Sequence, residues 1–288
     1  MDIAYLRKMV ADFLRTSPQN RVPASRALAP EIVGRRFYRD ALVGGAAADD
    51  PLFLSYRSPD VIGPHYRVPR DWLPKAKSVL AVFLAFEPWL LERYGRKAPP
   101  EREETFVPLR ETEAATHVLM ARLQTALAEA GHAAVVPSGD ARFFYWTRDG
   151  ISPAHGENHA ARPADVPFGS LWSERHAAYA AGLGTFSLSK GLITRLGVAG
   201  NAYSLVTDLV LPPTERPYAA FDAYCTHCGA CVARCPAGAI TREEGKDHNR
   251  CWPYYDTSAS AGERYNPPYG CVRCQVDVPC TFGIPGGE

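Results

Sequence analysis

Two spacings of apolar residues divide the amino-terminal part of the chain into helices and strands. Apolar positions recur at helical spacing over residues 1–16 and 112–130, which predicts an amphipathic helix in each segment. The segment 77–86 reads KSVLAVFLAF and is almost entirely apolar, so we expect a strand with both faces buried in the middle of a sheet. Two shorter apolar runs, 133–136 and 204–211, predict further strands.

The remaining segments of this region carry turn and loop signals. Residues 173–181 predict a short helix that stops at Gly182. Residues 18–70 are rich in proline, glycine and arginine and are expected to form mostly loop, as is the polar, proline-rich segment 150–169. Strands and helices mixed in this order predict an α+β protein with an α/β sandwich over residues 1–215.

The positions of the cysteines indicate a second domain in the remaining chain. All eight lie between Cys225 and Cys280, and the prolines at 212 and 213 mark a boundary before them, so we expect a second domain over 216–288. The first run is the spacing of bacterial ferredoxins, in which closely spaced thiolates wrap a [4Fe–4S] cube. It reads Cys225-x2-Cys228-x2-Cys231-x3-Cys235-Pro236. The alternative is zinc held by two CxxC pairs, which normally stand farther apart.

A second set of cysteines supplies the four further thiolates that a two-cluster domain needs. In such domains the fourth cysteine of a run ligates the other cluster. We therefore expect one cluster on Cys225, Cys228, Cys231 and Cys280, and another on Cys235, Cys251, Cys271 and Cys274. The alternative is a single cluster with four spare cysteines.

Composition and charge narrow the class of protein. The chain has 288 residues, of which 46% are apolar, with 32 basic and 31 acidic side chains and a net charge of +1. This excludes global disorder and gives no reason to expect nonspecific binding to nucleic acid or membrane. The start of the chain mixes charges with its apolar residues, unlike a signal peptide, and the longest apolar run, 79–86, is far short of a membrane span. We expect a cytoplasmic protein, in which thiols stay reduced and clustered cysteines bind metal.

A motif directly before the cysteines resembles one found in a known protein family. The turn AGLG at 181–184 follows a short helix that contains Glu174 and Arg175, and an apolar pair and a strand then lead into the cysteine run. This order resembles the epoxyqueuosine reductases and the catalytic part of the reductive dehalogenases. The resemblance implies a nitroreductase-like α/β domain followed by a two-cluster ferredoxin-like domain.

The same resemblance implies an iron–sulfur reductase that takes electrons from a low-potential donor of the ferredoxin or flavodoxin type. It implies cobalamin bound near the AGLG turn, with Gly182, Leu183, Gly184 and Lys190 as cofactor-binding candidates. The two glycines would let the backbone turn tightly and approach a flat macrocycle. The alternatives are a flavin in this domain, or an electron-transfer protein without an organic cofactor whose larger domain docks a partner.

The sequence departs from the tRNA-modifying reductases at three points. Their catalytic aspartate would fall at Phe168, and Asp165 is the nearest acid, so Asp165 is the candidate proton donor. Their usual basic residue falls at Leu188, with Lys190 two positions further on. Their helical-repeat tail is not found in the eight residues after Cys280. Together with the net charge, this favours an unidentified small-molecule substrate over tRNA.

Two further residues are catalytic candidates because of their position. His176 and Tyr179 stand on the helix before the AGLG turn, where a proton donor would be well placed, although packing would explain them equally well. His155 and His159 lie four apart in a loop rather than on a helix, so we do not expect them to bind a metal as a pair.

Overall fold

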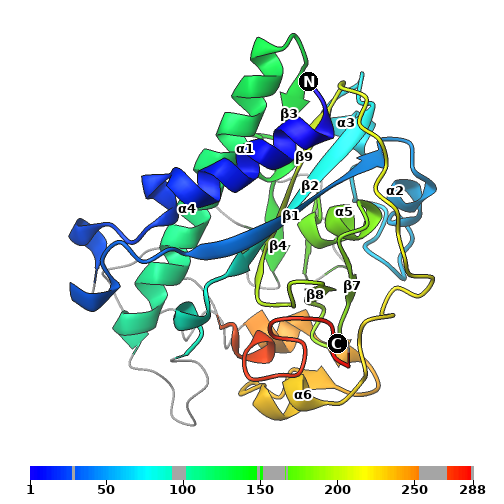
Figure 1. Cartoon of the computed structure of the whole chain (residues 1–288). Coiled ribbons are helices and arrows are strands. Elements are labelled where there is room, and N and C mark those ends of the chain that lie inside the picture. Colours follow the sequence, from blue (N-terminus) through cyan, green and yellow to red (C-terminus); the bar gives the residue numbers. More distant parts are fainter. Residues whose placement is uncertain are drawn as a thin grey trace.

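A computed structural model gives the fold. It describes residues 1–27, 30–92, 102–147, 150–151, 166, 168–252 and 271–286. The central sheet is antiparallel, in the order β1-β2-β9-β3, and consists of β1 (Tyr38–Ala47), β2 (Ser78–Phe86), β9 (Gly200–Thr207) and β3 (Ala134–Val135) (Figure 1). All nine residues of β2 are buried, so the prediction of a central, doubly buried strand is confirmed.

Helices cover both faces of this sheet. The long helices α1 (Ile3–Thr16) and α4 (Arg102–Glu129) lie on one face (Figure 1). The other face carries α5 (Glu174–Ala180) and the short helices α2 (Pro51–Ser55) and α3 (Pro69–Trp72). The helices predicted over 1–16, 112–130 and 173–181 are all present. Within the described part of the chain, no helix has the length and apolar character that crossing a bilayer requires.

Side chains of β2 alternate between the two cores, because successive residues of a strand point to opposite faces. Those that meet α1 and α4 are Leu80, Val82 and Leu84, and those on the α5 side are Val79, Ala81, Phe83 and Ala85. The result is a layered α/β domain in which β2 supplies apolar contacts to both faces.

The segment 18–70 contains more structure than its sequence predicts. The prediction of mostly loop is wrong there, because the ten-residue strand β1 pairs along the whole of β2. The strand YRDALVGGAA begins with charged residues and contains two glycines, so its local pattern is weak, and pairing with an apolar neighbour outweighs that propensity. The strand predicted over 204–211 lies four residues earlier, as β9.

Smaller elements complete the larger domain. A three-stranded sheet contains β4 (Tyr145–Thr147), β5 (Gly150–Ile151) and β6 (Gly169–Ser170), and a hairpin contains β7 (Gly184–Phe186) and β8 (Leu192–Thr194). Most of the loop predicted over 150–169 lies outside the described residues. Short 3-10 helices occupy Pro18–Asn20, Ala24–Arg26, Pro30–Ile32, Pro88–Leu90, Pro137–Gly139 and Arg273–Gln275.

The cysteine-rich part lies below the β7–β8 hairpin and has little regular structure (Figure 1). It contains α6 (Ala230–Arg234), β10 (Ile240–Thr241) and β11 (Gly245–Lys246). Its last segment is bonded to the larger domain, since the Val198 N–H donates to the Cys280 carbonyl at 2.8 Å. The Ala199 N–H likewise donates to the carbonyl of residue 281 at 3.2 Å.

Candidate iron–sulfur site

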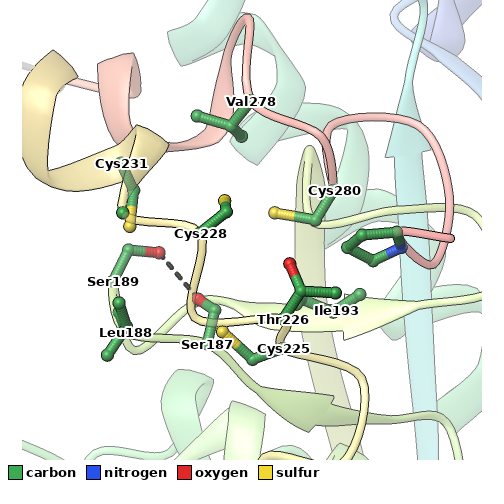
Figure 2. A pocket seen from close by; sticks show the side chains of 12 residues that line it. Ser187, Leu188, Ser189, Ile193, Cys225, Thr226, Cys228, Cys231, Val278 and Cys280 are labelled. Carbon is green, nitrogen blue, oxygen red and sulfur yellow. Dashed lines mark hydrogen bonds between the residues drawn. The ribbon is translucent and has the colours of Figure 1, made fainter. Parts of the chain in front are cut away.

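A pocket between the two parts of the chain collects four of the eight cysteines. It is lined by Cys225, Cys228, Cys231 and Cys280, which are the four residues predicted to share one cluster. Figure 2 shows their thiols around one space, which is partly open to solvent. The hairpin loop of the larger domain supplies the opposite wall, with Ser187, Leu188, Ser189 and Ile193.

The loop that carries the first three cysteines is shaped by its backbone and by one arginine. His227 and Gly229 both have positive φ, 51° and 77°, and these turns direct successive thiols toward the same side. The Arg242 guanidinium donates to the carbonyls of His227 at 2.6 Å and Cys228 at 2.7 Å, which clamps the loop. Nothing in the local sequence around Arg242 indicates this role.

Burial and the neighbouring thiols raise the pKa of two of these cysteines, Cys231 and Cys280. Burial raises the pKa of Cys231 to about 11, and the neighbouring Cys274, Cys225 and Cys228 add to the effect. Burial likewise raises the pKa of Cys280 to about 12, with contributions from the same loop cysteines. A bound metal centre would offset this effect, because metal ligation requires the thiolate form.

The other four cysteines also lie near one another. Burial raises the pKa of Cys271 to about 11, and the thiols of Cys274 and Cys251 add to the effect. The pKa of Cys274 is also raised, chiefly by burial, and both Cys251 and Cys235 contribute. The Ala239 N–H donates to the Cys235 sulfur at 3.3 Å.

The arrangement of the first set of cysteines suits a polynuclear centre. Among the described residues, no group of three or more His, Cys, Asp or Glu side chains is placed so that it could hold a metal ion directly. The first set instead surrounds a space, which a cluster of iron and sulfide needs between its thiolate ligands.

The AGLG turn does not offer an open cradle for a macrocycle. Gly182 has φ +76°, and a Cβ placed on it would lie 2.4 Å from the Glu215 carbonyl oxygen. A Cβ on Gly184 would lie 2.1 Å from the Ile193 carbonyl oxygen, and Leu183 is buried. Both glycines are therefore explained by close packing against the protein's own backbone. Lys190 is exposed on the turn between β7 and β8.

The two catalytic candidates on α5 lie in an aromatic cluster. The imidazole of His176 is 2.7 Å from the Ser173 hydroxyl and lies between the rings of Tyr56 and Phe186. Burial lowers its pKa to about 4, so it is neutral at physiological pH. The Tyr179 carbonyl accepts a hydrogen bond from the Tyr218 hydroxyl at 2.7 Å. Asp165, His155 and His159 lie outside the described residues.

One buried acid has a role that the sequence analysis did not assign. Glu174 was named there only as part of the helix before the AGLG turn, but at the start of α5 its carboxylate is buried against β9. The Ser204 hydroxyl donates to Glu174 Oε2 at 2.5 Å and accepts from Trp172 Nε1 at 2.9 Å. Burial raises the pKa of Glu174 to about 7. Ser204, in the middle of a strand, gives no sequence signal of this contact.

Comparison with known proteins first defines a class. The family model "4Fe-4S binding domain" matches residues 222–241, which contain the first cysteine run. The chain thus carries a 4Fe–4S binding motif of the ferredoxin type in these residues.

Individual relatives give a finer picture. The methylamine utilization ferredoxin-type protein MauM of Paracoccus denitrificans is 34% identical over 107 residues, which cover 36% of this chain and 40% of MauM. Structural neighbours are epoxyqueuosine reductases and reductive dehalogenases, the two groups named from the sequence. The Streptococcus thermophilus epoxyqueuosine reductase is 16% identical, with 86% of this chain and 64% of that chain covered and a TM-score of 0.45. The catabolic reductive dehalogenase NpRdhA is 16% identical, with 97% and 37% covered and a TM-score of 0.49. The chain therefore spans less than two thirds of each of these three relatives.

Proposed function

We propose that this chain is a two-cluster iron–sulfur oxidoreductase that accepts electrons from a low-potential carrier and delivers them to a small-molecule substrate. One observation carries the proposal: Cys280 stands in the pocket of Cys225, Cys228 and Cys231, although it lies far downstream in the sequence. Cys280 completes four thiols around that pocket, which leaves Cys235 of the same run available for a second cluster. The remaining four cysteines then form a complete second set.

Bound [4Fe–4S] clusters supply one-electron transfer at low potential. The protein's own residues define where this chemistry meets its partners. Cys228 is exposed, so the face around it is where an external carrier of the ferredoxin or flavodoxin type would approach. Cys231 and Cys274 belong to different sets and lie within electrostatic reach of each other, which supports close placement of the two centres.

The larger domain is the place for a substrate, but its AGLG turn does not fit a corrinoid. Leu183 and Gly184 are buried, and a Cβ on Gly182 would meet the Glu215 carbonyl oxygen, so we assign no step to cobalamin. This packing favours a second candidate function, a corrinoid-free electron-transfer protein whose larger domain docks a partner. Titration of the cluster-loaded protein with hydroxocobalamin distinguishes a cobalamin-dependent reductase from a corrinoid-free electron-transfer protein. Saturable binding would support the cobalamin site that the sequence resemblance implies, and no binding would support the corrinoid-free protein.

Cysteine replacement tests the two-cluster proposal directly. The intact anaerobic protein should contain about eight iron and about eight sulfide per chain. Cys231→Ala and Cys280→Ala should remove the same cluster, as judged from the electron paramagnetic resonance spectrum of the reduced protein. Cys235→Ala and Cys274→Ala should remove the other.

Cys231 and Cys235 form a matched pair for this test. They stand four positions apart on one short helix and its end, yet the proposal assigns them to different clusters. Identical spectra for Cys231→Ala and Cys235→Ala would contradict the crossed assignment. About four iron per intact chain would contradict the second cluster altogether.

A further inference from the structure

Two serine hydroxyls of the larger domain lie in the wall of the pocket that holds the first set of cysteines. Ser187 and Ser189 stand on the turn between β7 and β8, and both line that pocket. Both residues are buried, and their Oγ atoms lie 2.8 Å apart (Figure 2). Polar groups around a metal site tune its properties, so the pair is placed to act on a cluster in this pocket.

The turn that carries the two serines is closed by its backbone. The Ser187 N–H donates to the Gly191 carbonyl at 2.9 Å, and the Lys190 N–H donates to the Ser187 carbonyl at 2.8 Å. A Cβ on Gly191 would lie only 3.2 Å from Ser189 Oγ, so glycine at this position leaves room for the hydroxyls. The hydroxyls are therefore accommodated by the turn, and its main backbone bonds do not depend on them.

Hydrogen bonds also fix the β7–β8 hairpin against the first cysteine run. The Phe186 N–H donates to the carbonyl of residue 221 at 2.7 Å. The Tyr224 N–H donates to Thr185 Oγ1 at 2.9 Å, and Tyr224 directly precedes Cys225. Because both bonds join β7 to the segment that leads into the cysteines, the serines keep a defined position beside the pocket.

The two hydroxyls can share their protons in two ways. In one, Ser189 donates to Ser187 and Ser187 donates to the Gly191 carbonyl at 3.1 Å, so both protons are used within the turn. In the other, Ser187 donates to Ser189, whose own proton then has no acceptor among the described residues. A buried donor without an acceptor is unfavourable. The second arrangement therefore requires an acceptor in the pocket.

We propose that Ser189 donates a hydrogen bond to a sulfur atom of the first cluster and raises its reduction potential, while Ser187 accepts the same proton when that cluster is oxidised. The first cluster is the one assigned to Cys225, Cys228, Cys231 and Cys280, so this inference rests on the two-cluster function proposed above. Hydrogen bonds to the sulfurs are among the features that set the potential of such clusters. Reduction makes the sulfurs more negative and so strengthens the bond from Ser189.

A third hydroxyl allows a comparison within the same pocket. Thr226 also lines it, but this residue is exposed, whereas Ser187 and Ser189 are 9% and 4% exposed. Water competes for an exposed hydroxyl, and a hydrogen bond is stronger where solvent is excluded. The buried pair should therefore affect the cluster more than Thr226 does.

A potentiometric titration of the anaerobic, cluster-loaded protein tests the inference, with the electron paramagnetic resonance signal of each cluster as readout. Ser189→Ala should lower the midpoint potential of the first cluster only, by up to about tenfold in the ratio of reduced to oxidised cluster, or about 59 mV. Ser189→Thr retains the hydroxyl and should keep the wild-type potential. Ser187→Ala removes the competing acceptor, so it should not lower the potential. Thr226→Ala is the matched control and should have a smaller effect than Ser189→Ala.

A second measurement detects the hydrogen bond itself. Electron–nuclear double resonance of the reduced protein, in water and in deuterium oxide, reports exchangeable protons coupled to the first cluster. One such proton should be present in wild type, Ser187→Ala and Ser189→Thr and be lost in Ser189→Ala. A change in packing alone would not remove this proton.

The outcomes that contradict the inference are distinct from those that contradict the proposed function. An unchanged potential in Ser189→Ala, at full iron content, would overturn the inference and leave the two-cluster function intact. A lower potential in Ser187→Ala with none in Ser189→Ala would make Ser187 the donor and also overturn it. An equal shift in Thr226→Ala would show a general effect of pocket polarity, against the inference. A wild-type protein with only one cluster would instead refute the proposed function.

Discussion

Replacement of Glu174 by glutamine should stabilise the protein at neutral and alkaline pH. The Glu174 carboxylate is buried, its Oε1 has no hydrogen-bond partner in the described part of the chain, and the Ser204 hydroxyl donates to Oε2. Glutamine retains an oxygen that can accept from Ser204 and carries no charge. Glu174→Gln therefore removes the cost of burying an anion while keeping the hydrogen bond.

The size of the effect follows from the pKa. Burial raises the pKa of Glu174 from 4.5 to about 7 in the folded chain, and each tenfold change in an acid dissociation constant corresponds to about 1.4 kcal/mol. Below the unfolded value both states hold the proton, so Glu174 does not affect stability. Between the two values unfolding releases a proton, so wild-type stability falls as the pH rises. Above about pH 7 the loss is complete, at about 3 kcal/mol.

Thermal unfolding of the anaerobic, cluster-loaded protein measures this effect. Wild type and Glu174→Gln are followed by far-UV circular dichroism from about pH 5 to about pH 8, and the difference between the two curves isolates Glu174 from every other titrating group. The variant should gain several degrees over wild type as the pH rises, whereas Glu31→Gln, at an exposed site, should follow wild type throughout. A constant difference across this range would refute the reasoning.

Three further changes follow from contacts in the structure. Gly184→Ala should destabilise the chain by about 1–3 kcal/mol or more, because the new Cβ would meet the Ile193 carbonyl oxygen. Gly139→Ala is the control: its Cβ has room, so its thermal unfolding should be close to that of wild type. Tyr38→Phe should cost about 1–3 kcal/mol, because the buried Tyr38 hydroxyl bonds to the residue 112 carbonyl and to two side chains, and chemical denaturation would measure it. A fragment of residues 216–288 should retain less iron after reconstitution than the intact chain, since the larger domain provides one wall of the first pocket; equal iron content in the two would contradict this.

The features that could be predicted from the sequence have strong local patterns. Residues 77–86 are apolar at almost every position, and only a central strand buries them all. The cysteine spacing indicated two sets, and Cys280 lines one pocket with Cys225, Cys228 and Cys231, whereas the binding of a cluster by each set stays a prediction. The first inference came from the apolar pattern of one segment, and the second came from the spacing of the cysteines along the chain.

The features that could not be predicted depend on contacts between distant segments. β1 exists because β2 lies beside it, and its own residues favour a strand only weakly. Glu174 follows Ser173 at a helix start, which usually places an acid in solvent, but here the start of the helix packs against β9. The packing role of the AGLG glycines could not be predicted either, because the backbone atoms that leave no room for a side chain there belong to residues 193 and 215.

The hydrogen bonds from Val198 and Ala199 to the segment around Cys280 have a consequence for biogenesis. The fourth thiol of the first set is positioned by the end of a sheet and not by its own motif, so a chain in which the sheet has not formed presents only three thiols to incoming iron. Metal insertion would then select for molecules that have already folded. Iron content in a purified sample would report the fraction of chains whose two parts have docked, and a destabilising substitution far from any cysteine would lower it.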